Sequence, residues 1–406
     1  MWGVKRNMMN PRAHLVAATA MDDAPGKWTK RSSSSIVSDD RYMEVGDDDD
    51  DADCKSGKSN QKDRQGALFR VGTGRRGQRD GDARSATLNR PFSVCALKNG
   101  CGALAFTDMH NNAVRFIVPK EGRDADQKRC FAVRTVENAG LLTPKGMCSS
   151  DDGRYLFLCD TGHHKIKFAA LPGSSGLISA AESVAGVEIF TFAGNGKKAW
   201  RDGPVLDCSF NSPTAVWQCA DGTIVVTDTG NHCIRQIVRT GKGNLVVRTI
   251  AGGYASYQIP GQERMPENMD ANEFQHLNKR NAGFRDGRRA LFRSPSGIVE
   301  GPYGELLVAD TMNNCIRGLL PRSDGKLPWD VQTVCGVVEG GYIDGSCESA
   351  AFNQPMGLSM GPNGTFFVSD RGNCCIRQVG GCHAQLSQNK SDCLSYSWVR
   401  TIEIGE

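Results

Sequence analysis

A short motif that occurs five times constrains this 406-residue chain more than any other feature. One copy runs from Asp228 to Arg235 and reads Asp-Thr-Gly-Asn-His-Cys-Ile-Arg, between two apolar runs. Asp and Asn side chains hydrogen-bond nearby backbone amides in turns, and Gly230 is expected to supply any positive φ. The motif therefore predicts a β-hairpin whose strands are the flanking apolar runs. The other copies begin at Asp108, Asp160, Asp310 and Asp370.

Each copy of the motif lies within a longer unit of four short predicted strands. The first strand follows a proline, the second ends at the motif aspartate, the third follows the turn, and the fourth ends the unit. The strand-opening prolines are Pro91, Pro144, Pro213, Pro295 and Pro355. Successive motif aspartates are 52 to 82 residues apart, which indicates a common core with loops of different length. Four antiparallel strands repeated at this period predict a β-propeller, because one small sheet needs neighbours to cover its faces.

The units resemble the NHL-repeat family, which is named for an Asn-His-Leu triplet whose first two letters stand here as Asn231-His232. The resemblance covers about residues 66 to 404 and implies an all-β propeller of four-stranded blades. Five units are complete, and one extra fourth-type strand, Ala67–Val71, precedes them. Either five blades close the ring and leave a spare strand, or the chain is a six-bladed design whose final three strands are absent. We favour the second interpretation, because propellers of this family typically have six blades.

Residues 1–65 differ in composition from residues 66–406, which contain the predicted propeller. They include the runs Ser32–Ser35 and Asp47–Asp51 and few large apolar residues, so we expect a disordered, low-complexity leader. Its first residues resemble an organelle presequence only slightly, and a plain flexible leader is favoured. The chain has 16 cysteines and no C-x-x-C pair, which favours a cytoplasmic or other reducing intracellular location. Cys382 and Cys393 are the one pair to test for a disulfide.

A basic residue follows each motif aspartate by seven positions, and we interpret the two as a structural ion pair. Partly buried charges need partners, and an acid and a base in every unit at fixed spacing suit this role better than five binding sites. The basic residues are Arg115, Lys167, Arg235, Arg317 and Arg377. His164 and His232 occupy a turn position that holds Asn or Cys in other units, so they are not expected to bind a metal. The sequence predicts no catalytic residue and no cofactor.

The segments that join the blades carry the strongest functional signal. Gly72–Gly77 spells a dinucleotide-binding pattern, but no helix follows and a similar element recurs from Ala193, so we interpret both as blade connectors. Because strands alternate in direction, these connectors and the motif hairpins lie on one face. Three of the four connectors are basic, whereas Glu339–Asp344 is acidic. The candidate basic arc, including one tryptophan, comprises Arg75, Arg76, Arg79, Lys197, Lys198, Trp200, Arg201, Lys279, Arg280, Arg285, Arg288 and Arg289.

The function that we predict is a non-catalytic platform that holds a protein partner or an acidic peptide on this face. The first alternative is binding of single-stranded RNA on the same face, with Trp200 among the residues that contact bases. The equal alternative for the arc is an ordinary solvated surface, in which Arg79, Arg201 and Arg285 pair with adjacent acids.

A third possibility follows from the resemblance, because related propellers include lyases and lactone hydrolases with a metal in the central channel. Such a site needs several acids or histidines on the innermost strands. The residues five after each strand-opening proline include only one carboxylate, so catalysis is disfavoured. They are Ala96, Ser149, Gln218, Glu300 and Met360. No apolar run is long enough to span a membrane, and membrane insertion is not expected.

Overall fold

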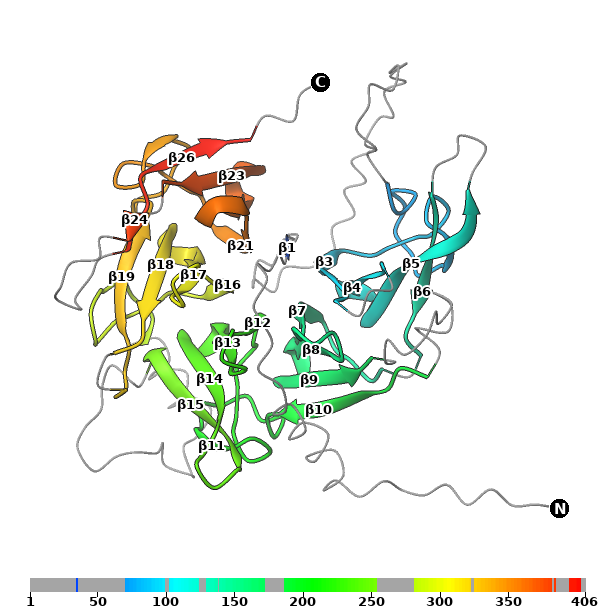
Figure 1. Ribbon diagram of the computed structural model, residues 1–406, viewed down its shortest axis with the longest axis horizontal. Coiled ribbons are helices and arrows are strands. Elements are labelled where there is room, and N and C mark those ends of the chain that lie inside the picture. Colours follow the sequence, from blue (N-terminus) through cyan, green and yellow to red (C-terminus); the bar gives the residue numbers. More distant parts are fainter. Residues whose placement is uncertain are drawn as a thin grey trace, which may run out of the picture.

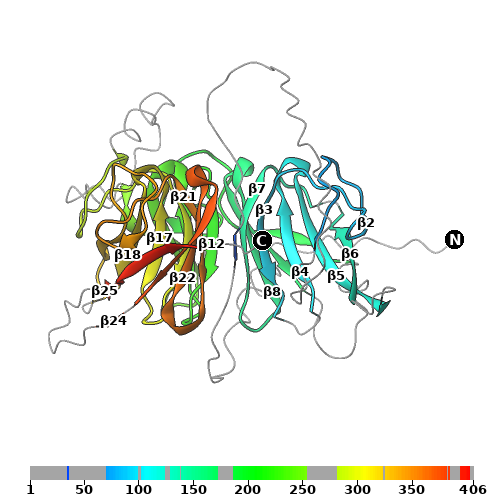
Figure 2. The same ribbon diagram turned by 90° about the horizontal axis from the view of Figure 1, so that it is seen from above.

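The computed structural model describes residues 34–35, 70–98, 102–123, 129–137, 139–171, 186–253, 281–322, 325–381, 383–384 and 394–402. Its strands form five small antiparallel sheets around a common axis, so the protein is a five-bladed β-propeller (Figure 1). Figure 2 shows the ring from the side, with the turns and connectors of the blades at two opposite faces.

Each blade has four main strands that follow one another from the ring axis outward. Blade 1 contains β3 (Pro91–Ala96), β4 (Leu104–Asp108), β5 (Ala113–Arg123) and β6 (Arg129–Thr135). Blade 2 contains β7 (Pro144–Ser149), β8 (Tyr155–Asp160), β9 (Lys165–Ala170) and β10 (Ile189–Ala193). Blade 3 contains β12 (Ala215–Gln218), β13 (Ile224–Asp228), β14 (Cys233–Arg239) and β15 (Leu245–Gly252). Blade 4 contains β16 (Pro295–Glu300), β17 (Leu306–Asp310), β18 (Cys315–Leu320) and β19 (Asp330–Cys335). Blade 5 contains β21 (Pro355–Met360), β22 (Phe366–Asp370), β23 (Cys375–Gly380) and β26 (Trp398–Thr401).

Three connectors add a short fifth strand to the outer edge of the blade that they precede. These strands are β2 (Gly81–Asp82), β11 (Gly203–Pro204) and β20 (Gly345–Ser346), which pair with β6, β15 and β26. In blade 4 the connector follows the same course, because the amide of Gly287 donates to the carbonyl of Val331 at 2.7 Å. Each connector thus runs across the outside of the next blade before its chain returns to the ring axis. A separate two-stranded hairpin consists of β24 (His383–Ala384) and β25 (Leu394–Ser395).

The motif hairpin contains a one-turn 3-10 helix after the motif aspartate. In every blade the fourth residue after that aspartate is in the left-handed region, with φ between 52° and 56°. In blade 3 this residue is His232, so the prediction that Gly230 supplies the positive φ is wrong. Gly230 is required for another reason. A Cβ atom there would lie 2.5 Å from the side chain of Asn211 in the connector.

A fourth strand ends each unit, as predicted. Of the extra strand predicted at Ala67–Val71, the structure describes only Arg70 and Val71, and neither lies in a strand. The predicted leader lies outside the described residues except for β1 (Ser34–Ser35), which pairs with β3. The candidate pair Cys382 and Cys393 also lies outside them. Among the helices in the described ranges, none is both long and apolar enough to cross a membrane.

Candidate functional site

The recurring spacing of the motif places a buried ion pair at the centre of blade 3. Nη1 of Arg235 lies 2.7 Å from Oδ2 of Asp228, and both side chains are fully buried. Nη2 of Arg235 lies 2.7 Å from Oδ1 of Asp202, which belongs to the connector that precedes the blade. One guanidinium therefore joins the hairpin to the connector through two carboxylates.

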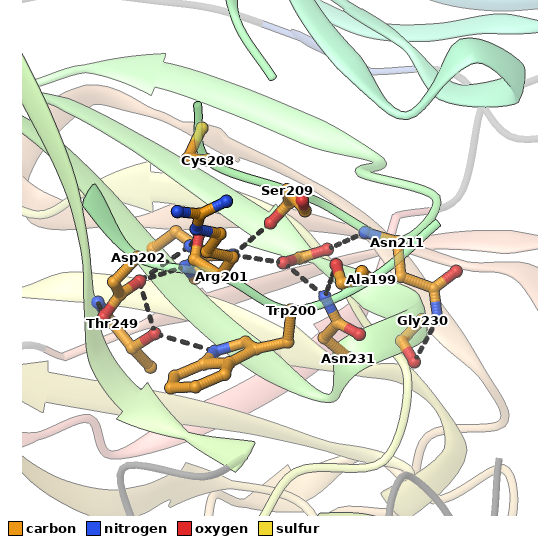
Figure 3. A network of polar contacts seen from close by, with 12 residues as sticks. Ala199, Trp200, Arg201, Asp202, Cys208, Ser209, Asn211, Gly230, Asn231 and Thr249 are labelled. Atoms are coloured by element: carbon orange, nitrogen blue, oxygen red, sulfur yellow. Dashed lines mark hydrogen bonds and ion pairs between the residues drawn. The ribbon is translucent and has the colours of Figure 1, made fainter. Parts of the chain in front are cut away.

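The remaining hydrogen-bonding groups of this ion pair are also used (Figure 3). The carbonyl oxygens of Arg201 and Ser209 accept from the Arg235 guanidinium at 2.8 and 3.0 Å. Asp202 accepts from the amide and the hydroxyl of Thr249 on the outer strand. Oδ1 of Asp228 accepts from the amide of Asn211 at 2.7 Å.

Blades 1, 4 and 5 repeat the network with equivalent residues. In each, the arginine lies 2.7 to 2.9 Å from the motif aspartate and 2.5 to 2.7 Å from a connector aspartate. The arginines are Arg115, Arg317 and Arg377, the motif aspartates are Asp108, Asp310 and Asp370, and the connector aspartates are Asp80, Asp286 and Asp344. These connector acids bind the motif arginines, and the side chains of Arg79 and Arg285 donate to the carbonyls of Ser85 and Arg289.

Blade 2 has a simpler arrangement. Nζ of Lys167 lies 3.2 Å from Oδ2 of Asp160 and donates to the carbonyl of Gly140 at 2.7 Å. His163 replaces the asparagine of the other hairpins and lies 2.9 Å from the same carboxylate oxygen. The connector from blade 1 is short and, in its described part, contributes no aspartate to Lys167. Blade 2 thus has one carboxylate beside its motif base where the other blades have two, a buried one from the hairpin and a partly exposed one from the connector.

Electrostatics support a structural role for these pairs. Burial raises the pKa of Asp228 to about 6, although the Arg235 charge opposes this shift. Burial also lowers the pKa of Arg235, but Asp202 and Asp228 outweigh it and the net direction is upward, so the guanidinium remains charged. Asp228 and Arg235 are enclosed and hydrogen-bonded, whereas the side chain of Asp202 is 31% exposed.

A second set of hydrogen bonds joins each blade to the next, and the sequence did not reveal it. In blades 1 to 4, the side chain of the left-handed residue at the end of the hairpin turn accepts the amide hydrogen of the residue before the next strand-opening proline. The acceptors are Asn112, His164, His232 and Asn314, the donors are Thr143, Ser212, Ser294 and Gln354, and the distances are 2.8 to 3.1 Å. Asn and His share this position because both can present an acceptor. The exchange of Asn and His at this position is the sequence signal that could have revealed these links between blades.

The histidines in this position must be neutral to accept a hydrogen bond. Nδ1 of His232 accepts from Ser294, so the ring proton resides on Nε2. Burial, with a smaller effect of Arg293, lowers the pKa of His232 to about 4. Burial, followed by Lys198, also lowers the pKa of His164. These histidines therefore link neighbouring blades.

The channel position that sequence reasoning considered for a metal is used for blade contacts. Oε1 of Gln218 accepts from the amide of Asp151 in blade 2, and Oε2 of Glu300 accepts from the amide of Ala220 in blade 3. In the described part of the chain, no group of three or more His, Cys, Asp or Glu residues could hold a metal ion.

The connectors that carry the basic arc begin on the face of the motif hairpins, whereas Arg288 lies 3.4 Å from Asp330, at the end of β19 that is remote from the hairpin. The side-chain amide of Asn111 donates to the carbonyl of Gly77, and that of Asn231 donates to the carbonyl of Ala199, so hairpins and connectors lie side by side. Nine of the basic residues predicted for the arc are described, and all are exposed: Arg75, Arg76, Arg79, Lys197, Lys198, Arg201, Arg285, Arg288 and Arg289. Lys279 and Arg280 lie outside the described residues.

The prediction for Trp200 requires a correction. Its side chain is 9% exposed, and its indole nitrogen donates to the hydroxyl of Thr249 at 3.0 Å. The ring lies beside the guanidinium of Arg235, 6.0 Å from its centroid. Trp200 therefore belongs to the interior of blade 3 and presents no face on which a base could stack.

Exposed apolar side chains adjoin the arc on the same face, and sequence reasoning did not find them. They are 37% to 60% exposed and lie on the third and fourth connectors and on the blade 4 hairpin. We call this group the apolar sector; it comprises Phe284, Met312, Val338, Tyr342 and Ile343. The side-chain amide of Asn314 donates to the carbonyl of Val338 at 3.0 Å and joins hairpin to connector. Isolated apolar residues in loops form no periodic pattern, so the sequence does not reveal the apolar sector.

Comparison with known proteins defines the class to which this architecture belongs. The family model described as NHL repeat matches residues 210–237 and 352–379. These ranges run from the end of a connector through the first three strands of blades 3 and 5. The chain is a β-propeller, and two of its five blades match the NHL-repeat model.

One curated relative and two solved structures illustrate the similarity. The protein SUPPRESSOR OF QUENCHING 1, chloroplastic, of Arabidopsis thaliana is 24% identical over 326 residues, which cover 77% of this chain and 27% of that protein. The chain thus spans about a quarter of that relative. Virginiamycin B lyase from Staphylococcus aureus is 13% identical, with 78% and 72% of the two chains covered and a TM-score of 0.40. An auxiliary nutrient binding protein from Bacteroides thetaiotaomicron is 15% identical, with 76% and 75% covered and a TM-score of 0.41. No functional statement follows from similarities of this size.

Proposed function

We propose that this propeller is a non-catalytic binding platform that holds a protein partner on the face of its hairpins and connectors. The observation that carries the proposal is the presence of the basic arc and the apolar sector on one face. Exposed apolar side chains with a charged surround are typical of protein interaction sites. The buried motif residues support this face but are not available to a ligand.

The chemistry of the face defines the kind of partner. Tyr342 and Phe284 are 60% and 43% exposed and suit the role of aromatic contacts in an interface. The arc residues Lys197 and Lys198 attract acidic groups and increase the rate of encounter with them. The expected ligand is therefore a segment in which acidic residues accompany apolar anchors.

Binding of single-stranded RNA is the second candidate, because the same arc can attract a phosphate backbone. Base stacking supplies much of the affinity of such sites. The burial of Trp200 removes the stacking residue that lies within the arc, and this observation favours a protein partner.

The experiment is selection from a random peptide phage library on the immobilised full chain. Enriched peptides should combine acidic and apolar residues, and the tightest peptide is then measured in solution. Arg75→Glu/Arg76→Glu and Lys197→Glu/Lys198→Glu should each weaken it at least about tenfold, roughly 1.4 kcal/mol. Lys242→Glu/Lys326→Glu is the matched control on the opposite face and should leave the affinity unchanged.

Two results would contradict the proposal. Equal loss of affinity in the control would place binding elsewhere or indicate a general charge effect. Failure to enrich peptides, together with tight poly(U) binding whose affinity falls steeply with salt, would favour RNA instead.

A further inference from the structure

The outer edge of blade 2 lacks the cover that the other blades have. In blades 1, 3 and 5 a short strand of the connector, β2, β11 or β20, pairs antiparallel with the outer strand. In blade 4 the amide of Gly287 donates to the carbonyl of Val331 on the outer strand. In blade 2 the sheet ends at β10, and no strand in the described ranges pairs with the outer side of β10 (Figure 1).

The exposure of one residue of β10 agrees with this difference. Ile189 pairs with Ala169 and is only partly buried. The residues in the equivalent register of the other outer strands are at most 3% exposed, because a connector covers them. They are Val133, Val247, Val331 and Val399. An apolar side chain is thus partly accessible at the outer edge of blade 2.

The connector that enters blade 2 omits the segment that forms a fifth strand elsewhere. In blade 3 the carbonyl of Arg201 accepts from the motif base, and the amide of Asn211 donates to the motif aspartate. In blade 2 the carbonyl of Gly140 and the amide of Leu142 have these two roles. Residues 202–210 lie between the two positions in blade 3, whereas one residue lies between them in blade 2. Both connectors are thus anchored alike, and blade 2 lacks the strand-forming segment between the anchors.

Blade 2 keeps the groups that bind the connector aspartate in other blades. In blade 3 that aspartate accepts from the amide and the hydroxyl of Thr249, which lies opposite Arg235. Thr191 of β10 lies opposite Lys167 in the same register. The Lys167 ammonium has three donors, and its contacts with Asp160 and a backbone carbonyl occupy at most two of them. In the described part of the chain no second acid reaches this lysine and threonine, so the edge presents a carboxylate site without a carboxylate of its own.

The aspartate of each connector that covers a blade is followed by a glycine. The φ of this glycine lies between 83° and 139° in all four connectors, a region in which other residues are strained. In blades 1, 3 and 5 the glycine pairs with the outer strand. The dipeptides are Asp80-Gly81, Asp202-Gly203, Asp286-Gly287 and Asp344-Gly345. A segment that covers blade 2 in the same way therefore needs an aspartate followed by a glycine.

We propose that β10 binds an extended segment of a partner protein as an antiparallel fifth strand, and that this segment contains Asp-Gly followed by a basic residue. The aspartate accepts from Lys167 and Thr191, and the glycine pairs with Ile189. The next residue of the segment lies opposite Glu188, which is exposed, so a lysine or arginine there completes an ion pair across the strands. The site lies at the outer edge of blade 2 rather than on the face of the hairpins, so it does not depend on the function proposed above.

NMR titration of the isotope-labelled full chain with a capped peptide tests the site. The peptide Ser-Asp-Gly-Lys-Val-Leu has no net charge and should shift the amide signals of Ile189 and Thr191 in a saturable way. The peptide with asparagine in place of aspartate is the matched control. It should bind at least about tenfold more weakly, because the charge-assisted hydrogen bonds to the carboxylate are lost. Thr191→Val keeps the shape of the side chain but removes the hydroxyl, and should weaken binding of the aspartate peptide by about three- to tenfold.

Several results would overturn the proposal. Absence of shifts in β10 at low millimolar peptide would show that the edge binds no such strand, and equal binding of the two peptides would exclude recognition of the carboxylate. Slow hydrogen exchange of the Thr191 amide in the free chain would show that the chain itself covers this edge. Arg75→Glu/Arg76→Glu should leave the peptide affinity unchanged, and loss of affinity in that variant would place binding on the basic arc instead.

Discussion

Blades 2 and 3 pair the buried motif aspartate with different basic residues. In blade 3, Arg235 joins the hairpin carboxylate of Asp228 to the connector carboxylate of Asp202. In blade 2, Lys167 contacts the carboxylate of Asp160 and a backbone carbonyl. Both arrangements support the same four strands.

The difference shows what the connector contributes. Arginine presents several donors in a planar fork, whereas lysine is a compact point charge. A long connector places an aspartate beside the second nitrogen of the guanidinium. A threonine of the outer strand, such as Thr249, donates a hydrogen bond to that aspartate. The short connector before blade 2 brings no such acid among its described residues, and a lysine is then sufficient. The motif base and the preceding connector thus vary together.

The largest expected effect comes from removing the base in each blade. Arg235→Leu leaves two carboxylates without their cation, one of them fully buried, and should lower the free energy of unfolding by about 3–5 kcal/mol. Lys167→Leu leaves only Asp160, which keeps the amide of Leu142 and the ring of His163, and should cost about 1.5–3 kcal/mol. Urea unfolding followed by tryptophan fluorescence measures both. Equal losses would contradict the difference drawn between the blades.

Exchanging the two bases is a sharper test with a smaller effect. Arg317→Lys in blade 4 should lose the contact with Asp286 and destabilise the protein by about 1.5–3 kcal/mol, because a charged hydrogen bond is left unmade. Lys167→Arg should change stability by less than about 0.5 kcal/mol, since a second donor gains no carboxylate there. A gain above that range in the blade 2 variant would mean that an acid outside the described residues reaches this position.

The links between blades also predict a pH dependence. The folded-state pKa of His232 is about 4, below the value of about 6.5 expected when unfolded. The unfolded state therefore binds a proton first, and stability is lost as pH falls from about 6.5 to about 4. His232→Asn places the residue of blades 1 and 4 in this position and should keep the link but reduce this loss. The His164→Asn variant is the comparison, with a smaller reduction expected because His164 is less enclosed.

Comparison of wild type and variant in the same buffers removes the contributions of other groups. The measured quantity is the difference in the free energy of unfolding between pH 7 and pH 4.5. An identical pH dependence in wild type and His232→Asn would show that this ring does not titrate with folding.

The sequence predicted the repeated features of this protein well and the unrepeated ones poorly. The spacing of Asp228 and Arg235 recurs, so their association and the strands around them could be inferred from pattern alone. The second carboxylate, Asp202, was not recognised as a partner of Arg235, because its contact depends on how a connector crosses the blade. Periodicity also could not distinguish a buried Trp200 from an exposed Tyr342, since both precede a connector aspartate by two positions.

The central claim is that the motif residues hold the blades while the connectors bind the partner. It is tested most directly by measuring, on the same proteins, the affinity for the selected acidic peptide and the free energy of unfolding. Lys197→Glu/Lys198→Glu should lose at least about tenfold in affinity, roughly 1.4 kcal/mol, with unchanged stability. Arg235→Lys should lose stability and keep the affinity of the folded protein. Wild-type affinity in the connector variant, or loss of affinity in folded Arg235→Lys, would contradict the claim.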